Sequence, residues 1–410
     1  MAVFKDHKLK LSELFKVIPE EIFVAIAENT NVDYYAKSLN GKLLYYLLLY
    51  ALLTDDKLSQ RGISDLYSSP HFRLLFNFQL KKDKIAHSSI SERLSKIEVE
   101  YFKQLYEYIY ARFSTLFPTQ TISGLKFQRV DSSLVKETSN KLKEGLTCGN
   151  EHKKSKMLKY TINYDGMYGS CAQVHKEEKY ASESLALPEN VLSHFKNSVD
   201  HANVYIFDRG QSSAEAFSNM KSHNGLLFVG RLLENRKLHI IKDFDCTFKR
   251  FDQGVLKQDA LVQLYKIETV TGKNGHPVRK QILVNETFRV IRFRPKDGKE
   301  DIVLITNILN FRAETIASMY RRRWDIEVFF RFLKQEVNFS HFISLNDNGI
   351  QVILYMTLIA AMLIMIYKKE NGLGFKTAKR RMGIELQELI IAIVVVQTGG
   401  DLSKVNLPAP

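Results

Sequence analysis

The segment from 320 to 334, YRRRWDIEVFFRFLK, carries residue types that suit contact with a phosphate backbone. Because an α-helix advances about 100° per residue, Tyr320, Arg323, Glu327 and Lys334 are expected within an arc of about 60° on one helix. Arginine and lysine bind phosphate oxygens, tyrosine donates a hydroxyl, and a carboxylate can hold a metal ion. The alternative is an amphipathic helix whose charged face meets water. Apolar residues that would anchor the opposite side in a core are Ile326, Phe329, Phe332 and Leu333.

Two aspartates elsewhere in the chain follow runs typical of β-strands. Asp131 comes after KFQRV and Asp208 after VYIF, so each is expected at a strand end, where α/β proteins present catalytic side chains. Each alone is more simply a turn-forming or helix-capping aspartate. Together with Glu327 they form a set of hard oxygen ligands, with no His or Cys at metal spacing, that suits Mg²⁺ or Mn²⁺. Two such ions can activate a water and stabilise the leaving oxygen in phosphodiester cleavage.

The whole chain has 410 residues, 45% of them hydrophobic, and a formal net charge of +14. It is long enough for two or three domains, and its charge predicts a polyanionic partner, nucleic acid before an anionic membrane. Cys148, Cys171 and Cys246 lack C-x-x-C spacing, which argues against a zinc site or a disulfide framework and favours a reducing interior. The apolar run 352–367 is shorter than the roughly 20 residues that span a bilayer, so we expect a buried core helix and no membrane association.

The patterns divide the chain into five parts. Residues 1–120 are mostly helical, and SQRGISDLYSS at 59–69 allows a helix-turn-helix that binds DNA ends, although helical packing with no DNA contact explains the same pattern. Alternating strands and helices follow in 121–225, then a run of strands in 226–310 with TGKNGH as a hairpin turn. Residues 311–398 are expected to be the C-terminal helices of the catalytic core that begins in 121–225, and 399–410 form a tail. The predicted class is α/β: a mixed sheet flanked by helices, an antiparallel β-rich insertion and a helical N-terminal domain.

The sequence resembles the insertion-sequence DDE transposases of the IS4 type. Their signature is Tyr, two residues, Arg, three residues, Glu, six residues, Lys, which the segment at 320–334 matches at every position. VDSS and FDRG match the surroundings of the two catalytic aspartates, and the resemblance covers roughly 120–370. It implies a ribonuclease H-like core in which Asp131, Asp208 and Glu327 hold two Mg²⁺ or Mn²⁺ ions. Water would cut a transposon end, and the freed 3′-hydroxyl would attack a phosphodiester without a covalent protein–DNA link.

The same resemblance implies partners and contacts. Tyr320, Arg323 and Lys334 would grip phosphates near the transposon terminus, and Arg209 would add a DNA contact beside the second aspartate. Double-stranded DNA would be bound at terminal inverted repeats and at the target, by a homodimer in the bacterial cytoplasm at the nucleoid.

This chain departs from some relatives in two ways. Asp208 is followed by Arg-Gly-Gln and not by Arg-Glu-Ala-Asp, so the longer fingerprint is absent. Some relatives stack a tryptophan of the insertion on a flipped base, whereas Trp324 is the only tryptophan here and lies outside the insertion. Tyr265, Phe288 or Phe293 are the candidates to replace it, and cleavage through hairpin ends stays open.

Two other functions compete. A tyrosine recombinase would use Tyr320 as its nucleophile, with His276 and Arg279 of the segment HPVR, but that chemistry needs a packed helical pocket and GKNGHPVRK is typical of a hairpin tip. A non-catalytic DNA-binding protein, or a decayed transposase, would bind ends without cutting them. Metal chelation separates the recombinase from the carboxylate site, and Glu327→Gln separates the binder from the enzyme.

Overall fold

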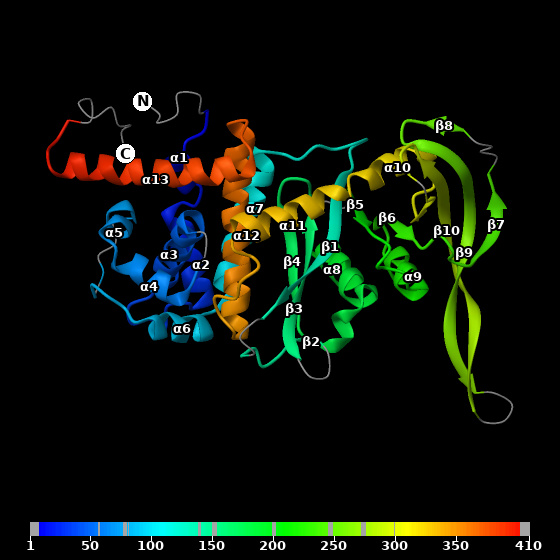
Figure 1. Cartoon of the computed structure of the whole chain (residues 1–410), viewed down its shortest axis with the longest axis horizontal. Coiled ribbons are helices and arrows are strands. Elements are labelled where there is room, and N and C mark those ends of the chain that lie inside the picture. The colour runs from blue at the N-terminus through cyan, green and yellow to red at the C-terminus, as the bar shows by residue number, and fades with distance from the viewer. Residues whose placement is uncertain are drawn as a thin grey trace. The chain divides into compact units, whose positions relative to one another are not determined.

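The computed structural model describes residues 8–55, 58–76, 80, 82–137, 141–149, 154–198, 202–244, 249–271, 276–298 and 300–401, in two compact units (Figure 1). The helical unit comprises residues 1–118, 135–143 and 330–410, and the sheet unit comprises 119–134 and 144–329. In this division residues 330–410 group with the N-terminal helices, whereas the sequence assigned 311–398 to the catalytic core. Cys246, the hairpin turn at 272–275 and the end of the tail lie outside the described residues.

Two nearly apolar helices, α3 and α12, are largely buried in the helical unit. Its elements are α1 (Leu11–Phe15), α2 (Glu20–Thr30), α3 (Gly41–Thr54), α4 (Gln60–Ser68), α5 (Pro70–Phe76), α6 (His87–Lys96), α7 (Val99–Leu116), α12 (Asp347–Glu370) and α13 (Phe375–Gln397). Helix α12 packs against α3, α6, α7 and α13. Among the described residues it is the one helix that could cross a membrane by length and composition, but 83% of its most apolar window is buried. Its burial agrees with the predicted core helix.

In the part of the sheet unit that the structure describes, eleven strands form one sheet. They are β1 (Lys126–Lys136), β2 (Leu146–Cys148), β3 (Ser155–Tyr164), β4 (Gly169–His175), β5 (Asn203–Phe207), β6 (Leu227–Leu232), β7 (Leu238–Asp243), β8 (Arg250–Phe251), β9 (Gly254–Thr271), β10 (Pro277–Pro295) and β11 (Ile302–Thr306). The helices of this part of the chain are η1 (Glu178–Ala181), α8 (Glu183–Asn197), α9 (Ala214–Ser222), α10 (Ala313–Arg321) and α11 (Trp324–Glu336), the last continuing into the helical unit.

The strand order identifies the fold. Strands β4, β3, β1, β5 and β6 are neighbours in that order, β3 and β4 are antiparallel, and β1, β5 and β6 are parallel. Helices α8 and α9 make the crossovers between the parallel strands, which is the ribonuclease H-like arrangement and confirms the predicted class. Strands β11, β10, β9 and β7 then continue the same sheet in antiparallel fashion. Figure 1 shows β9 and β10 extending beyond it as a twisted ribbon.

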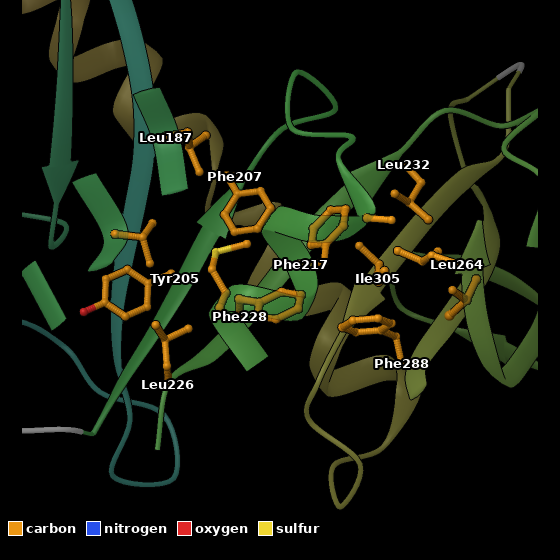
Figure 2. Close-up of a cluster of buried hydrophobic side chains, with 14 of the residues drawn as sticks. Leu187, Tyr205, Phe207, Phe217, Leu226, Phe228, Leu232, Leu264, Phe288 and Ile305 are labelled. Carbon is orange, nitrogen blue, oxygen red and sulfur yellow. The ribbon is translucent and has the colours of Figure 1, made fainter. Parts of the chain in front are cut away.

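Alternation along β5 explains how the sheet is buried on both faces. Tyr205 and Phe207 join a core under α8 and α9, whereas Val204 and Ile206 join the core under α10. Figure 2 shows the first core, in which the rings of Phe207, Phe217 and Phe228 stack. Each fully buried phenylalanine contributes roughly 1.5–3 kcal/mol to folding. The packing therefore fixes the end of β5, directly before Asp208.

Candidate active site

The sequence predicted Asp131 at the end of a strand, and this prediction is wrong. Asp131 lies inside strand β1. The parallel pairing of β1 with β5 ends at Arg129, but β1 itself continues to Lys136 beside β3. Asp131 therefore lies just beyond the last residue that pairs with β5. The backbone N–H of Ser132 donates a hydrogen bond of 2.8 Å to its Oδ1 atom.

The charge of Asp131 is disfavoured in this position. Burial, followed by the negative charges of Glu183 and Asp208, raises the pKa of Asp131. The hydrogen bond from Ser132 and the charge of Arg323 lower it, and the net result is a pKa of about 6. The carboxyl group is thus close enough to these residues for their charges to act on it. An additional positive charge at this point would favour its ionised form.

Asp208 directly follows β5, as predicted from the sequence. The hydroxyl of Tyr320 donates to Asp208 Oδ1 at 2.9 Å, and Arg323 Nη1 lies 3.9 Å from Oδ2. Although burial alone would raise it, the pKa of Asp208 is lowered by the backbone N–H of Arg209, by Arg323, by Tyr320 and by Arg231. Asp208 is therefore held in its ionised form.

Glu327 lies in the first turn of α11 and shares its cation with Asp208. Arg323 Nη2 donates to Glu327 Oε1 at 2.6 Å, while its Nη1 faces Asp208. One guanidinium group thus links the second and third carboxylates. Arg323 thus contacts Asp208 and Glu327, and its charge also acts on Asp131, although the three acids are separated by up to 196 positions in the chain.

The signature segment is not the single helix that was predicted. Helix α10 ends at Arg321 and α11 begins at Trp324. At this junction the backbone N–H groups of residues 322, 323, 325 and 326 each donate to the carbonyl oxygen three residues earlier, the tighter 3₁₀ pattern. The predicted apolar side is correct: Ile326, Phe329, Phe332 and Leu333 are all buried. The break places Tyr320 on one helix and Glu327 on the next, with Arg323 at the turn.

Arg129 of β1 holds this break in place, a role that the sequence did not reveal. Its buried guanidinium donates to the carbonyl oxygen of Arg322 at 3.1 Å and forms an ion pair of 3.0 Å with Asp325. Gly166 has a φ of 104°, and a Cβ there would lie 2.9 Å from Nη1 of Arg129, so glycine is required at that turn. Strand β1, which carries Asp131, is thereby tied to the helix that carries Glu327.

The carboxylates of Asp131, Asp208 and Glu327 are of a chemical type that binds hard divalent cations, but in this structure they do not lie close enough together to coordinate one ion. Among the residues that the structure describes, no three His, Cys, Asp or Glu side chains come close enough to hold a metal ion. Arg323 instead links Asp208 and Glu327. Oxygen-only donors and the accumulation of negative charge at Asp131 fit Mg²⁺ or Mn²⁺.

The arrangement does not fit a tyrosine recombinase. Tyr320 is buried, its hydroxyl donates to Asp208, and burial followed by the charge of Asp208 raises its pKa far above the usual value. A phenolate nucleophile is therefore disfavoured. Arg279 lies on the two-stranded ribbon opposite Thr269, and the exposed His276 precedes β10. Neither lies in a packed helical pocket.

A cavity of 390 Å³ adjoins the site and is lined in part by Tyr320, Arg323 and Trp324. Trp324 is 54% exposed, and Phe293 lines the same cavity from β10. Of the aromatic residues considered for stacking on a base, Phe288 is excluded because its ring is fully buried in the core of Figure 2. Tyr265 lies on the ribbon, with the ammonium of Lys237 over its ring at 4.9 Å.

The predicted phosphate-binding residues fall into two groups. Tyr320 and Arg323 contact the carboxylates, whereas Arg209 is exposed next to Asp208, and Lys334 is exposed on the part of α11 that belongs to the helical unit. Residues near the site that sequence reasoning missed are Arg129, Lys159, Glu183 and Arg231. Arg129 and Lys159 could have been noticed as charged residues inside predicted strands, in the runs FQRV and LKYT. No local pattern marks Glu183.

A family model described as a transposase DDE domain matches residues 123–363, and the chain therefore belongs to the DDE transposases of insertion sequences, enzymes that cleave and join DNA. Members of this family generally use divalent metal ions. The chain is 24% identical, over 85% of its own length and 82% of the relative's, to "Probable transposase for insertion sequence element IS5377" of Geobacillus stearothermophilus. It is 25% identical, over 48% of each chain, to "Putative transposase for insertion sequence element IS4SA" of Synechocystis sp..

A solved structure, described as a piggyBac transposase synaptic complex with hairpin DNA, shares 13% sequence identity with this chain. The similarity covers 93% of this chain and 80% of that one, with a TM-score of 0.43.

Proposed function

We propose that this transposase cuts the ends of its own element and joins them to target DNA in a Mg²⁺-dependent reaction, with Asp131, Asp208 and Glu327 as the metal-binding residues. The observation that carries the proposal is their convergence around Arg323 on a ribonuclease H-like sheet. The net charge of +14 attracts the phosphate backbone of DNA, but the carboxylates would repel it locally. A divalent cation bound between them would remove this repulsion.

The residues around the carboxylates have separate roles in this proposal. Tyr320 holds Asp208 through its hydroxyl, and Arg323 neutralises Asp208 and Glu327 until divalent ions take its place. Once withdrawn from Glu327, the guanidinium is free to bind a phosphate near the transposon terminus. The ions would supply an activated water or 3′-hydroxyl and stabilise the leaving oxygen.

The decisive test of this function compares Glu327→Gln with Glu336→Gln, a change near the end of the same helix. With the ends of the element and Mg²⁺, Glu327→Gln is expected to lose cleavage by a factor of at least 100 while binding the ends with unchanged affinity. Glu336→Gln should behave as the wild type. EDTA should abolish wild-type cleavage. Cleavage that persists in Glu327→Gln, or in EDTA, would remove Glu327 and the metal from the mechanism.

The exposed cations Arg209 and Lys334 are proposed to bind phosphates of the terminal inverted repeat. Each neutralised phosphate contact contributes about one unit to the salt dependence of binding, so Lys334→Ala should reduce the magnitude of the negative slope of log K against log salt by about 0.9. Glu336→Gln, two residues along the helix, should leave the slope unchanged. An unchanged slope in Lys334→Ala would place this lysine away from the DNA.

The remaining proposals concern assembly and family. We infer that the protein belongs to the IS4 type, on the match of Tyr320, Arg323, Glu327 and Lys334 to that signature. We also infer that it acts at the nucleoid as a homodimer that pairs two element ends, with α4 to α6 as a candidate end-binding region. Light scattering of the complex with one terminal repeat should give a mass of two chains and two DNA duplexes. A mass of one chain and one duplex would exclude the homodimer.

A further inference from the structure

Glu183, the first residue of α8, contacts the neighbourhood of both catalytic aspartates. The hydroxyl of Ser132 donates to Glu183 Oε2 at 2.8 Å, and Lys159 Nζ donates to Glu183 Oε1 at 3.0 Å. On the side of the second aspartate, a Cβ placed on Gly210 would lie 2.8 Å from Cγ of Glu183. The turn that follows Asp208 therefore packs directly on this side chain.

Ser132 connects Glu183 to Asp131. Its backbone N–H donates to Asp131 Oδ1 at 2.8 Å, its hydroxyl reaches Glu183, and that hydroxyl also lies 2.9 Å from Thr161 Oγ1 on β3. The orientation of the Asp131 carboxylate thus depends on a residue whose side chain is fixed by Glu183. Hydrogen bonds of this kind from an outer shell orient metal ligands in many proteins.

Lys159 fixes Glu183 in turn. Its side chain is only 3% exposed, and its ammonium also donates to the carbonyl oxygen of Ala181 at 2.8 Å. A buried ammonium needs a partner, so the pair holds the carboxylate in one position. If Glu183 served only to neutralise Lys159, neither the bond to Ser132 nor the close approach of Gly210 would be needed.

We propose that Glu183 is a fourth acidic residue of the active site, a positioning residue that orients Asp131 toward the divalent cation through Ser132. The inference rests on the proposed function, because it assumes that Asp131 binds the ion. It places the negative charge of Glu183 beside those of Asp131 and Asp208. It also gives the first turn of α8 a role beyond that of the three acids Asp131, Asp208 and Glu327.

The test is divalent-ion binding by the full chain without DNA, with Mn²⁺ as the probe and free Mn²⁺ followed by electron paramagnetic resonance. Glu183→Gln is expected to weaken Mn²⁺ binding about tenfold, the lower end of what outer-shell changes cause. The matched control is Glu189→Gln on the same helix, where the carboxylate accepts from the hydroxyl of Tyr180 at 2.6 Å. Its Mn²⁺ affinity should equal that of the wild type.

Ser132→Ala keeps the pair of Lys159 and Glu183 and so guards against a variant that fails to fold. It should weaken Mn²⁺ binding in the same direction, with a thermal unfolding midpoint near that of the wild type. In cleavage assays both variants should need more Mg²⁺ for half-maximal activity and approach the wild-type rate at saturating Mg²⁺. End binding should not change.

A purely structural role predicts a different pattern. Both variants would then bind Mn²⁺ with wild-type affinity, whatever their thermal stability, and that result would overturn the inference. Asp208→Asn separates this failure from failure of the proposed function. If Asp208→Asn loses Mn²⁺ while the changes at Glu183 and Ser132 have no effect, only the further inference is wrong. If Asp208→Asn also binds Mn²⁺ normally, the metal site itself is wrong.

Discussion

Replacing Asp131 by Asn is expected to make the metal-free protein more stable at pH 8 while abolishing its activity. Burial, followed by the nearby negative charges, raises the pKa of Asp131 from 3.8 to about 6. The ionised carboxylate is therefore disfavoured in the folded state. Two pKa units correspond to at most about 3 kcal/mol at a pH well above both values. An asparagine has no charge to bury, and its amide oxygen can still accept from Ser132.

The sign of the pH dependence follows from the direction of the shift. A carboxyl group whose folded pKa is raised costs stability above that pKa, and the cost fades as the pH falls from about 6 to below 3.8, because both states then bind the proton. The advantage of Asp131→Asn should thus be greatest at pH 8, smaller at pH 5 and absent below pH 3.8. For a unit of this size, about 3 kcal/mol corresponds to a rise of roughly 6–12 °C in the unfolding midpoint.

Thermal unfolding in EDTA at several pH values measures this effect, with Asp243→Asn, an exposed carboxylate on β7, as the control. The control should leave the midpoint unchanged. Added Mg²⁺ should raise the midpoint of the wild type and not that of Asp131→Asn, because a ligand stabilises only the form that binds it. The conclusion that the ionised form of Asp131 is disfavoured in the folded protein would be refuted by either of two results. One is a variant less stable than the wild type at pH 8, and the other is a stability difference that does not shrink on acidification.

Three further changes test the surroundings of the site. Tyr320→Phe removes the hydroxyl that donates to Asp208, so cleavage should fall about 10- to 150-fold, the equivalent of roughly 1.5–3 kcal/mol for a bond to a charged group, while the fold persists in circular dichroism. Arg289→Met leaves Asp259 buried without the two bonds of 2.7 Å from the guanidinium, and urea unfolding should show a loss of about 3–5 kcal/mol. Gly230→Ala should cost about 1–3 kcal/mol, because its Cβ would lie 2.5 Å from the ring of the phenylalanine before Asp208. Unchanged cleavage in the first case, or unchanged stability in the others, would contradict these roles.

The parts of the site that local patterns determine could be predicted from the sequence. Alternating β-branched and aromatic residues located β5, and Asp208 follows it as expected. The spacing of Tyr320, Arg323 and Glu327 identified residues that do meet in the structure. The apolar run at 352–367 correctly indicated a buried helix. In each case the signal lies within about fifteen neighbouring residues.

The parts that depend on long-range packing could not be predicted. The break between α10 and α11 is held by Arg129, which lies 193 positions before Arg322, so the helical spacing of the signature gave no warning of it. Asp131 was expected at a strand end because polar residues follow it, yet β1 continues beside β3. Glu183 reaches the site only because α8 begins beside Ser132, a contact between residues 51 positions apart.

The most direct measurement is the anomalous scattering of Mn²⁺ in crystals of the protein with a terminal repeat bound. We expect manganese peaks within about 2.0–2.3 Å of carboxylate oxygens of Asp131, Asp208 and Glu327, and Arg323 withdrawn from Glu327 to a phosphate. Manganese bound elsewhere, or Arg323 still joining Asp208 to Glu327 in the presence of DNA and Mn²⁺, would contradict this expectation.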